Sequence, residues 1–148
     1  MTDTATTAGG KPPTDGTTYH PLAGEDFPPG TPVCQSSDDD GTVLSAMADS
    51  VDTAAVVGLA AGIGIEGSSI LVKYSGPIHL TTAQWDVVTG QTGGLTRGSI
   101  YFLSSATAGR LTTTAPSSEG DFVTQCGIAL SATDLMIQIG PTVINPSE

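Results

Sequence analysis

Alternating apolar and polar positions recur along this chain, and they predict short β-strands. Residues 70–74 and residues 135–139 each place an isoleucine, valine, leucine or tyrosine at every second position. Because successive side chains of a strand point to opposite faces of the sheet, such alternation predicts strands that turn one face toward a core. We therefore expect both segments to lie in sheets that cover a hydrophobic interior.

The stretch "IYFL", residues 100–103, differs because both of its faces are apolar. Ile100 and Phe102 share one face, and Tyr101 and Leu103 share the other. A strand that is apolar on both sides lies in the middle of a sandwich or beneath a partner subunit. We expect a neighbouring chain to cover one face, which makes Tyr101 and Phe102 candidate contact residues.

The arrangement of glycines and apolar runs occurs twice along the chain. The interval of 11 residues from Gly30 to Gly41 recurs from Gly98 to Gly109, and each copy ends in an apolar run that precedes Gly-Pro. A unit of this size cannot bury its apolar face alone, so repeated units pack against one another. The repeat therefore predicts two similar β-units in contact.

The two predicted units span about residues 28–78 and residues 94–144. The first is longer by five residues in its last interval, and these fit the stretch "GIGIE" as an extended hairpin tip. Between the units, "TTAQWDVV" begins with a threonine suited to cap a short helix, which would end at Gly90. We expect Trp85 in this helix to fill the core between the units, with a contact to a neighbouring chain and a ligand-stacking platform as alternatives.

The beginning of the chain lacks this patterning. Residues 1–26 consist mainly of threonine, glycine, proline and small polar residues, and such a segment cannot form a core of its own. We expect an extended N-terminal arm over residues 1–26, ahead of a β-rich domain over residues 27–148. The arm is either a tail or a segment that orders on another subunit; we expect the latter, with Tyr19, Leu22 and Phe27 as candidate anchors.

Composition favours an all-β fold. The 148 residues include 19 glycines and 10 prolines, whereas aromatic residues make up only 5%. Many turn residues and few large side chains favour short strands over helices, and a body of roughly 120 residues buries one modest core. The expected fold class is all-β: a small β-sandwich or β-barrel-like body built from two similar β-units, with an extended N-terminal arm.

The chain is strongly acidic, with 15 Asp and Glu against 4 Lys and Arg and a net charge of −11. This charge repels nucleic-acid phosphates and anionic membranes, so we expect neither as a partner, whereas a basic protein surface would attract it. No apolar stretch approaches the roughly 20 residues that span a bilayer, and the first residues lack the pattern of a secretion signal. We expect synthesis in the cytoplasm of the producing cell, with release only as part of a larger particle.

Two short motifs invite a ligand interpretation, but the residues around each favour a turn. "GIGIEG", residues 62–67, has the glycine spacing of a dinucleotide-binding loop, yet the β-branched "SSILVKYSG" follows where a helix is required. "DDDG", residues 38–41, lacks the alternate acids and distal glutamate of a calcium loop, and it occupies the repeat position of "ATAG", residues 106–109. We expect turns at both, with no metal and no cofactor.

Catalytic chemistry has few candidate residues in this sequence. Histidine occurs only as His20 and His79, and no serine lies in a Gly-x-Ser-x-Gly turn. Cys34 and Cys126 are far apart, without metal-ligand spacing and without a histidine beside them, so we expect two buried thiols rather than a disulfide. We expect no catalytic residues and a protein that is not an enzyme.

The stretch from "LTTAQWDVVTG" to "LMIQIG", residues 80–140, resembles a segment of tailed-bacteriophage virion proteins, among them capsid decoration (cement) proteins, head fibres and some tail-fibre modules. The pieces "WDVVTG", "GGLTRGSIYFLS", "GRLTTTAP" and "CGIALSATDLMIQIG" carry this resemblance. The preceding "PGTPVCQ", "GLAAGIG" and "ILVKYSGPI" more loosely resemble the start of small cement proteins.

The resemblance implies a non-enzymatic, β-rich virion protein that is made in the host cytoplasm and assembles as a homotrimer on the outer surface of the capsid. It would bind the major capsid protein and brace the head against the pressure of the packaged genome. The alternative is a head- or tail-fibre module that binds a host receptor or glycan. Tip loops without aromatic side chains favour decoration. The candidate subunit or capsid contacts are Tyr19, Leu22, Phe27, Trp85, Tyr101 and Phe102.

Overall fold

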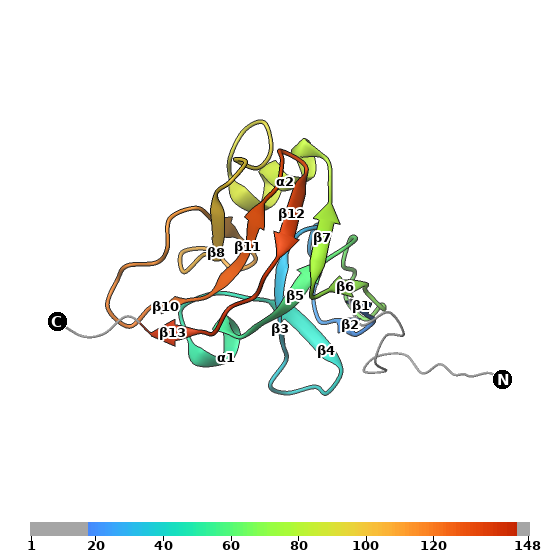
Figure 1. The fold of residues 1–148 in the computed structure, drawn as a ribbon. Coiled ribbons are helices and arrows are strands. Elements are labelled where there is room, and N and C mark those ends of the chain that lie inside the picture. The colour runs from blue at the N-terminus through green and yellow to red at the C-terminus, as the bar shows by residue number, and fades with distance from the viewer. Residues whose placement is uncertain (1–17, 145–148) are drawn as a thin grey trace.

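The computed structural model describes residues 18–144, and these residues form an all-β body (Figure 1). Strands make up 35% and helices 9%, which confirms the expected fold class. The strands form two curled sheets and one separate pair, joined by short connections. The first 17 residues of the expected arm lie outside the described residues.

The first sheet is built from the N-terminal half of the chain and has six strands in the order β1-β6-β5-β3-β4-β2. Its strands are β1 (Thr18–Tyr19), β2 (Leu22–Ala23), β3 (Pro32–Gln35), β4 (Thr42–Ser45), β5 (Val56–Ala60) and β6 (Val72–Lys73). A one-turn helix, α1 (Val51–Ala54), connects β4 to β5.

The second sheet has five strands in the order β7-β12-β11-β8-β9. Its strands are β7 (Gly76–His79), β8 (Ile100–Leu103), β9 (Leu111–Thr112), β11 (Gln125–Ala129) and β12 (Asp134–Ile137). Helix α2 (Thr82–Thr89) follows β7, and β10 (Phe122–Val123) pairs with β13 (Val143–Ile144) beside the sheet.

The two sheets share one strand order. The run β4-β3-β5-β6 in the first corresponds to β9-β8-β11-β12 in the second, with β1 and β7 as the matching outer strands. The strand register agrees as well. Val33 pairs with Gly58 in the first sheet, and Tyr101 pairs with Gly127 in the second. In both ladders the pairing skips one residue at the next pair, which marks a β-bulge or irregularity at the same place. The glycine spacing in the sequence therefore reflects two copies of one β-unit.

The turn between β3 and β4 also matches the turn between β8 and β9. Ser36 Oγ accepts hydrogen bonds from the amides two and three residues later, at 3.2 Å each, and Ser104 Oγ does the same at 3.1 and 3.2 Å. Each turn ends at a glycine with positive φ, 76° at Gly41 and 74° at Gly109. Since the acidic "DDDG" forms the same turn as the neutral "ATAG", its carboxylates are not needed for this turn.

The boundaries of the units differ from those expected. The segment 18–26 is not an arm, because β1 pairs with β6 through Thr18 opposite Lys73 and Tyr19 opposite Val72. Likewise β7 pairs with β12 of the second sheet, although the repeat in the sequence places residues 76–78 in the first unit. The units therefore run over about residues 18–73 and 76–137, and the predicted boundaries at 26, 28, 78 and 94 do not mark their edges.

Strand β2 closes the first sheet on itself. Leu22 lies opposite Thr42 in parallel pairing with β4, and it also bridges to Ser69, in line with the β1–β6 ladder. A sheet that closes in this way leaves few unpaired backbone groups at its edges. The interior of this small barrel holds Ala23, Phe27, Val33, Val43, Ala60, Ile70 and Val72.

Helix α2 takes the place of β2 in the second unit, since it follows β7 and packs against β9. Thr81 caps the helix through a capping box with Gln84, and Gly90 ends it in the left-handed conformation, as the sequence predicts. The buried face of α2 carries Trp85 and Val88. A larger cluster of buried side chains joins this unit to the face of the first sheet opposite the barrel interior, and it includes Ala54, Leu59, Trp85, Tyr101, Leu103, Cys126, Leu135 and Ile137.

Candidate functional site

Two of the six candidate contact residues are fully enclosed by their own chain. Trp85 and Tyr101 have 0% exposure, so neither side chain has surface left to bury against a neighbour. The interpretation of Trp85 and Tyr101 as subunit or capsid contacts is therefore wrong. Trp85 lies in the core, as the first of the three interpretations of this residue expects.

A hydrogen bond fixes the position of Trp85 in the core. Its indole Nε1 donates to the carbonyl oxygen of Thr133 at 2.7 Å, across 48 positions of sequence. A buried indole N–H needs such a partner, because leaving it unpaired costs about 1–3 kcal/mol. Trp85 thus ties α2 to the turn before β12 and closes the second unit.

Tyr101 organises the loop between α2 and β8. Its hydroxyl donates to Gln91 Oε1 at 2.6 Å and accepts from the amide of Thr96 at 2.7 Å. The ring fills the core while the hydroxyl satisfies two polar groups of the loop. The aromatic side chain at this strand position is therefore covered from within the chain, by the loop that precedes the strand.

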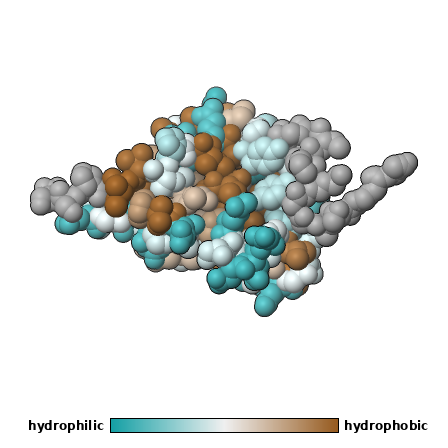
Figure 2. All heavy atoms as spheres, turned by 90° about the horizontal axis from the view of Figure 1, so that it is seen from below, coloured by the Kyte–Doolittle hydropathy of each residue, from teal (hydrophilic) through white to brown (hydrophobic). Residues whose placement is uncertain are grey.

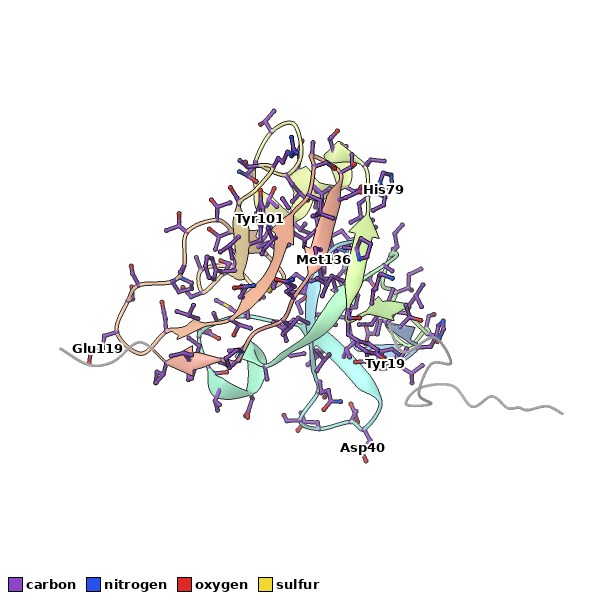
Figure 3. All side chains as sticks on the ribbon, viewed as in Figure 1. Tyr19, Asp40, His79, Tyr101, Glu119 and Met136 are labelled. Atoms are coloured by element: carbon purple, nitrogen blue, oxygen red, sulfur yellow. The ribbon has the colours of Figure 1, made fainter. Side chains whose placement is uncertain are left out.

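Phe102, Tyr19 and Leu22 are half-buried, so they keep some surface for a contact, but they come from different sheets. Tyr19 packs on Tyr74 with ring centroids 6.1 Å apart, and its hydroxyl is buried without a hydrogen-bond partner among the described residues. Burial raises the pKa of Tyr19 to about 12. Figure 3 shows Tyr19 beside β1 and β6, away from Tyr101.

An apolar groove with a volume of about 450 Å³ lies on the first unit. We call it the Ile63–Ile65 groove. Its floor includes Phe27, which is 5% exposed, and its outer wall carries Ile63 and Ile65, which are 69% and 58% exposed. The lining residues are Asp26, Phe27, Pro28, Pro29, Ile63, Gly64 and Ile65.

Backbone contacts hold the two walls of this groove together. Phe27 and Gly64 exchange both backbone hydrogen bonds, at 3.1 and 2.7 Å, and the amide of Glu66 donates to Asp26 Oδ1 at 2.8 Å. A Cβ at Gly64 would lie 2.4 Å from the Phe27 ring, so the close approach requires glycine. The apolar side chains on the outer wall are thus exposed on a segment with fixed backbone contacts.

A second hollow of about 280 Å³ adjoins the groove and shares Asp26, Phe27 and Pro28 with it. Its far side comes from the second unit, through Val87 on α2 and Arg110 beside β9. The recessed surface therefore continues from the β5–β6 connection to α2.

The groove adds contact candidates that the sequence pattern did not indicate, namely Pro28, Pro29, Ile63 and Ile65. The pattern indicates a hairpin tip at "GIGIE", and the absence of aromatic side chains from the tip loops drew attention away from its isoleucines. The sequence feature that could have indicated this contact surface is the pair of isoleucines in the glycine-rich stretch 62–67, which the second copy lacks. Exposed apolar residues that a fold does not need favour a contact surface.

No group of three or more His, Cys, Asp or Glu side chains in residues 18–144 is placed to hold a metal ion. His79 Nδ1 lies 2.6 Å from Asp134 Oδ1 in an exposed pair, and this hydrogen bond lowers the pKa of Asp134. Figure 3 shows Asp40 at the tip of the β3–β4 turn, far from His79.

The two cysteines are free thiols and both are buried, which confirms the expectation for them. Burial raises the pKa of Cys34 to about 11 and that of Cys126 to about 12. Because the thiolate is the reactive form, we expect both thiols to react slowly at neutral pH. They belong to the core rather than to a site.

Comparison with models of known protein families and with curated proteins finds no match for this chain. Within residues 18–144, no helix has both the length and the apolar character needed to cross a membrane.

Proposed function

We propose that this chain is a structural protein of a tailed-bacteriophage virion, without enzymatic activity, that binds the outside of the capsid as a decoration protein. Its partners are the major capsid protein and further copies of itself in a homotrimer. The resemblance of residues 80–140 to such virion proteins is the starting point, and the exposed apolar surfaces of the described body support it.

The observation that carries the proposal is the presence of two separate exposed apolar surfaces. One is the Ile63–Ile65 groove, in the connection between β5 and β6. The other includes Val51 on α1 with Val143 and Ile144 on β13, which are 64%, 56% and 55% exposed. In Figure 1, β13 and α1 lie on the side away from β6.

Figure 2 shows hydrophobic residues gathered on the side of β13 and α1, next to the C-terminal end of the described chain. An exposed apolar surface marks a site of protein contact. A decoration protein that is also a homotrimer needs two such contacts, one with its own copies and one with the shell.

The exposed apolar side chains favour decoration over the fibre alternative. Among residues 18–144, the large apolar side chains with high exposure are all valine, leucine or isoleucine. A module that binds glycans would present aromatic faces or convergent polar groups in a pocket. Aliphatic surfaces are suited to contact with another protein.

Binding to capsids that lack this protein tests the proposal. We expect the chain to bind such capsids in a fixed ratio and to raise their resistance to heat, because a ligand of the assembled shell stabilises that state by mass action. High salt should weaken the charged part of the contact. Binding to host cells or purified glycans, without binding to capsids, would establish the fibre alternative.

Sedimentation equilibrium tests the homotrimer. We expect a particle of three chains of 14.8 kDa each, and we expect Val143→Asp to dissociate it. A wild-type protein that stays monomeric at all concentrations would contradict this part of the proposal.

A further inference from the structure

The outer wall of the Ile63–Ile65 groove is an insertion in one of two matching units. The hairpin of the first unit closes with a hydrogen bond from Ala61 N to Leu71 O at 2.8 Å, and that of the second closes with one from Leu130 N to Asp134 O at 2.8 Å. Ten positions separate the first pair and four the second. Since the second unit forms its hairpin without the extra residues, they are not required to close the hairpin.

The inserted segment presents an open backbone edge beside its apolar side chains. Gly64 directs both its N–H and its C=O at Phe27. In an extended chain the neighbouring residues direct their backbone groups the opposite way. The amides of Ile63 and Ile65 accordingly have no partner within residues 18–144, whereas the carbonyl oxygen of Ile65 accepts a hydrogen bond from the amide of Ser68 at 2.9 Å. Both residues are exposed. An edge of this kind accepts a further strand.

The negative charge around the groove favours a basic binding partner over a second copy of this acidic chain. Asp26 lines the groove and Glu66 follows Ile65 on its wall, whereas the basic side chain of this recessed surface, Arg110, lines the adjoining hollow and not the groove itself. A second copy of this chain has only 4 Lys and Arg against 15 Asp and Glu, so it offers few basic side chains to place opposite these two acids. A strand with Lys or Arg opposite Asp26 and Glu66 would gain from the same charges.

We propose that residues 63–65 receive an extended strand of a different protein, which pairs with the free amides of Ile63 and Ile65 and places an apolar side chain in the groove. A basic residue of that strand lies opposite Asp26 and Glu66. This inference rests on the proposed function, which identifies the partner as the major capsid protein. It goes further by naming the contact.

Binding of variants to capsids that lack this protein tests the contact. Ile63→Ser with Ile65→Ser should raise the Kd about 10-fold or more, because each isoleucine loses its buried area. Leu130→Ser, in the matching turn of the second unit, is the control and should bind as the wild type does. Glu66→Lys should also weaken binding, whereas Glu119→Lys, an equal change of charge at an exposed position on another loop, should have little effect.

Hydrogen exchange distinguishes strand pairing from a contact of side chains alone. The amides of Ile63 and Ile65 should exchange fast in the free protein and become protected on capsids. Protection that is present in the free protein and lost on deletion of residues 1–17 would assign the edge to the chain's own N-terminal segment and overturn the proposal. Dissociation of the homotrimer by the Ile63 and Ile65 variants would assign the edge to a second copy and overturn it too.

The outcomes separate this inference from the proposed function. Wild-type protein that does not bind capsids would contradict the decoration function. Wild-type protein that binds while the Ile63 and Ile65 variant binds equally well would leave that function standing and overturn the inference. Unchanged far-ultraviolet circular dichroism and melting temperature establish that each variant is folded.

Discussion

Phe27 and Gly64 face one another across the Ile63–Ile65 groove and exchange both backbone hydrogen bonds, with the Phe27 ring 2.4 Å from the place where a Cβ of Gly64 would lie. The ring thereby fills the space that any other residue at position 64 would need. This contact positions the exposed isoleucines on either side of Gly64.

Gly64→Ala should lower the free energy of unfolding by about 1–3 kcal/mol, because the added methyl group must displace the Phe27 ring. Chemical denaturation measures the change. Gly62→Ala, in the same loop with no atom within 4 Å of its Cβ, is the matched control and should be close to neutral. Equal effects of both substitutions would show that the Phe27 contact is not the cause.

Trp85→Ala should destabilise the protein by about 3–5 kcal/mol, since it leaves a large cavity and removes the partner of the Thr133 carbonyl. Val87→Ala on the same helix is the comparison, because Val87 is 52% exposed and should change stability little. Thermal unfolding of both variants measures the difference. A Trp85→Ala protein of normal stability that only fails to oligomerise would restore the contact role for this residue.

Tyr101→Phe should lower the free energy of unfolding by about 1–3 kcal/mol, because the Thr96 amide and the Gln91 side chain lose their partner inside the loop. The change is local, so the amide of Thr96 should exchange faster while the amides of β11 keep their protection. If the Thr96 amide of the variant exchanges at the wild-type rate, water has replaced the tyrosine hydroxyl without a loss of free energy, which would contradict this prediction.

The pair of His79 and Asp134 predicts a pH-dependent stability. The pKa of Asp134 is lowered in the folded state, mainly by the His79 hydrogen bond, so its stabilising contribution is present above the ordinary value of 3.8 and is lost as the pH falls through the lowered value. Asp134→Asn should therefore be less stable than wild type near about pH 6, and the difference should shrink toward about pH 2. A difference in stability that does not change with pH would rule out the carboxylate as its source.

Thiol reagents should label Cys34 and Cys126 slowly at neutral pH, because both thiols are buried and burial raises their pKa values to about 11 and about 12. Labelling should become fast once denaturant unfolds the chain. Rapid labelling of the native protein would show that one of these thiols opens to solvent without global unfolding.

The fold class and the turns of the body follow from local patterns of the sequence. Strands β6 and β12 cover only part of the alternating segments 70–74 and 135–139, and within them the alternation reflects the period of a strand. The positive φ of Gly41 and Gly109 explains why glycine recurs at that interval. The cap at Thr81 and the stop at Gly90 likewise depend on neighbouring residues, so α2 was predictable.

The assignments that failed depend on contacts between distant residues. Residues 18–23 have no periodicity, yet their backbone groups pair with residues 68–73 some fifty positions later, and this pairing makes them strands. The sequence alone does not tell whether Tyr101 is covered by its own loop or by a partner chain, because either would bury the same apolar side chain. The Ile63–Ile65 groove exists because Phe27 and Gly64 meet across two loops, a proximity that no local pattern encodes. Hydrophobic burial and strand pairing act on whichever segments the folded chain brings together, and the positions of these residues were therefore set by packing.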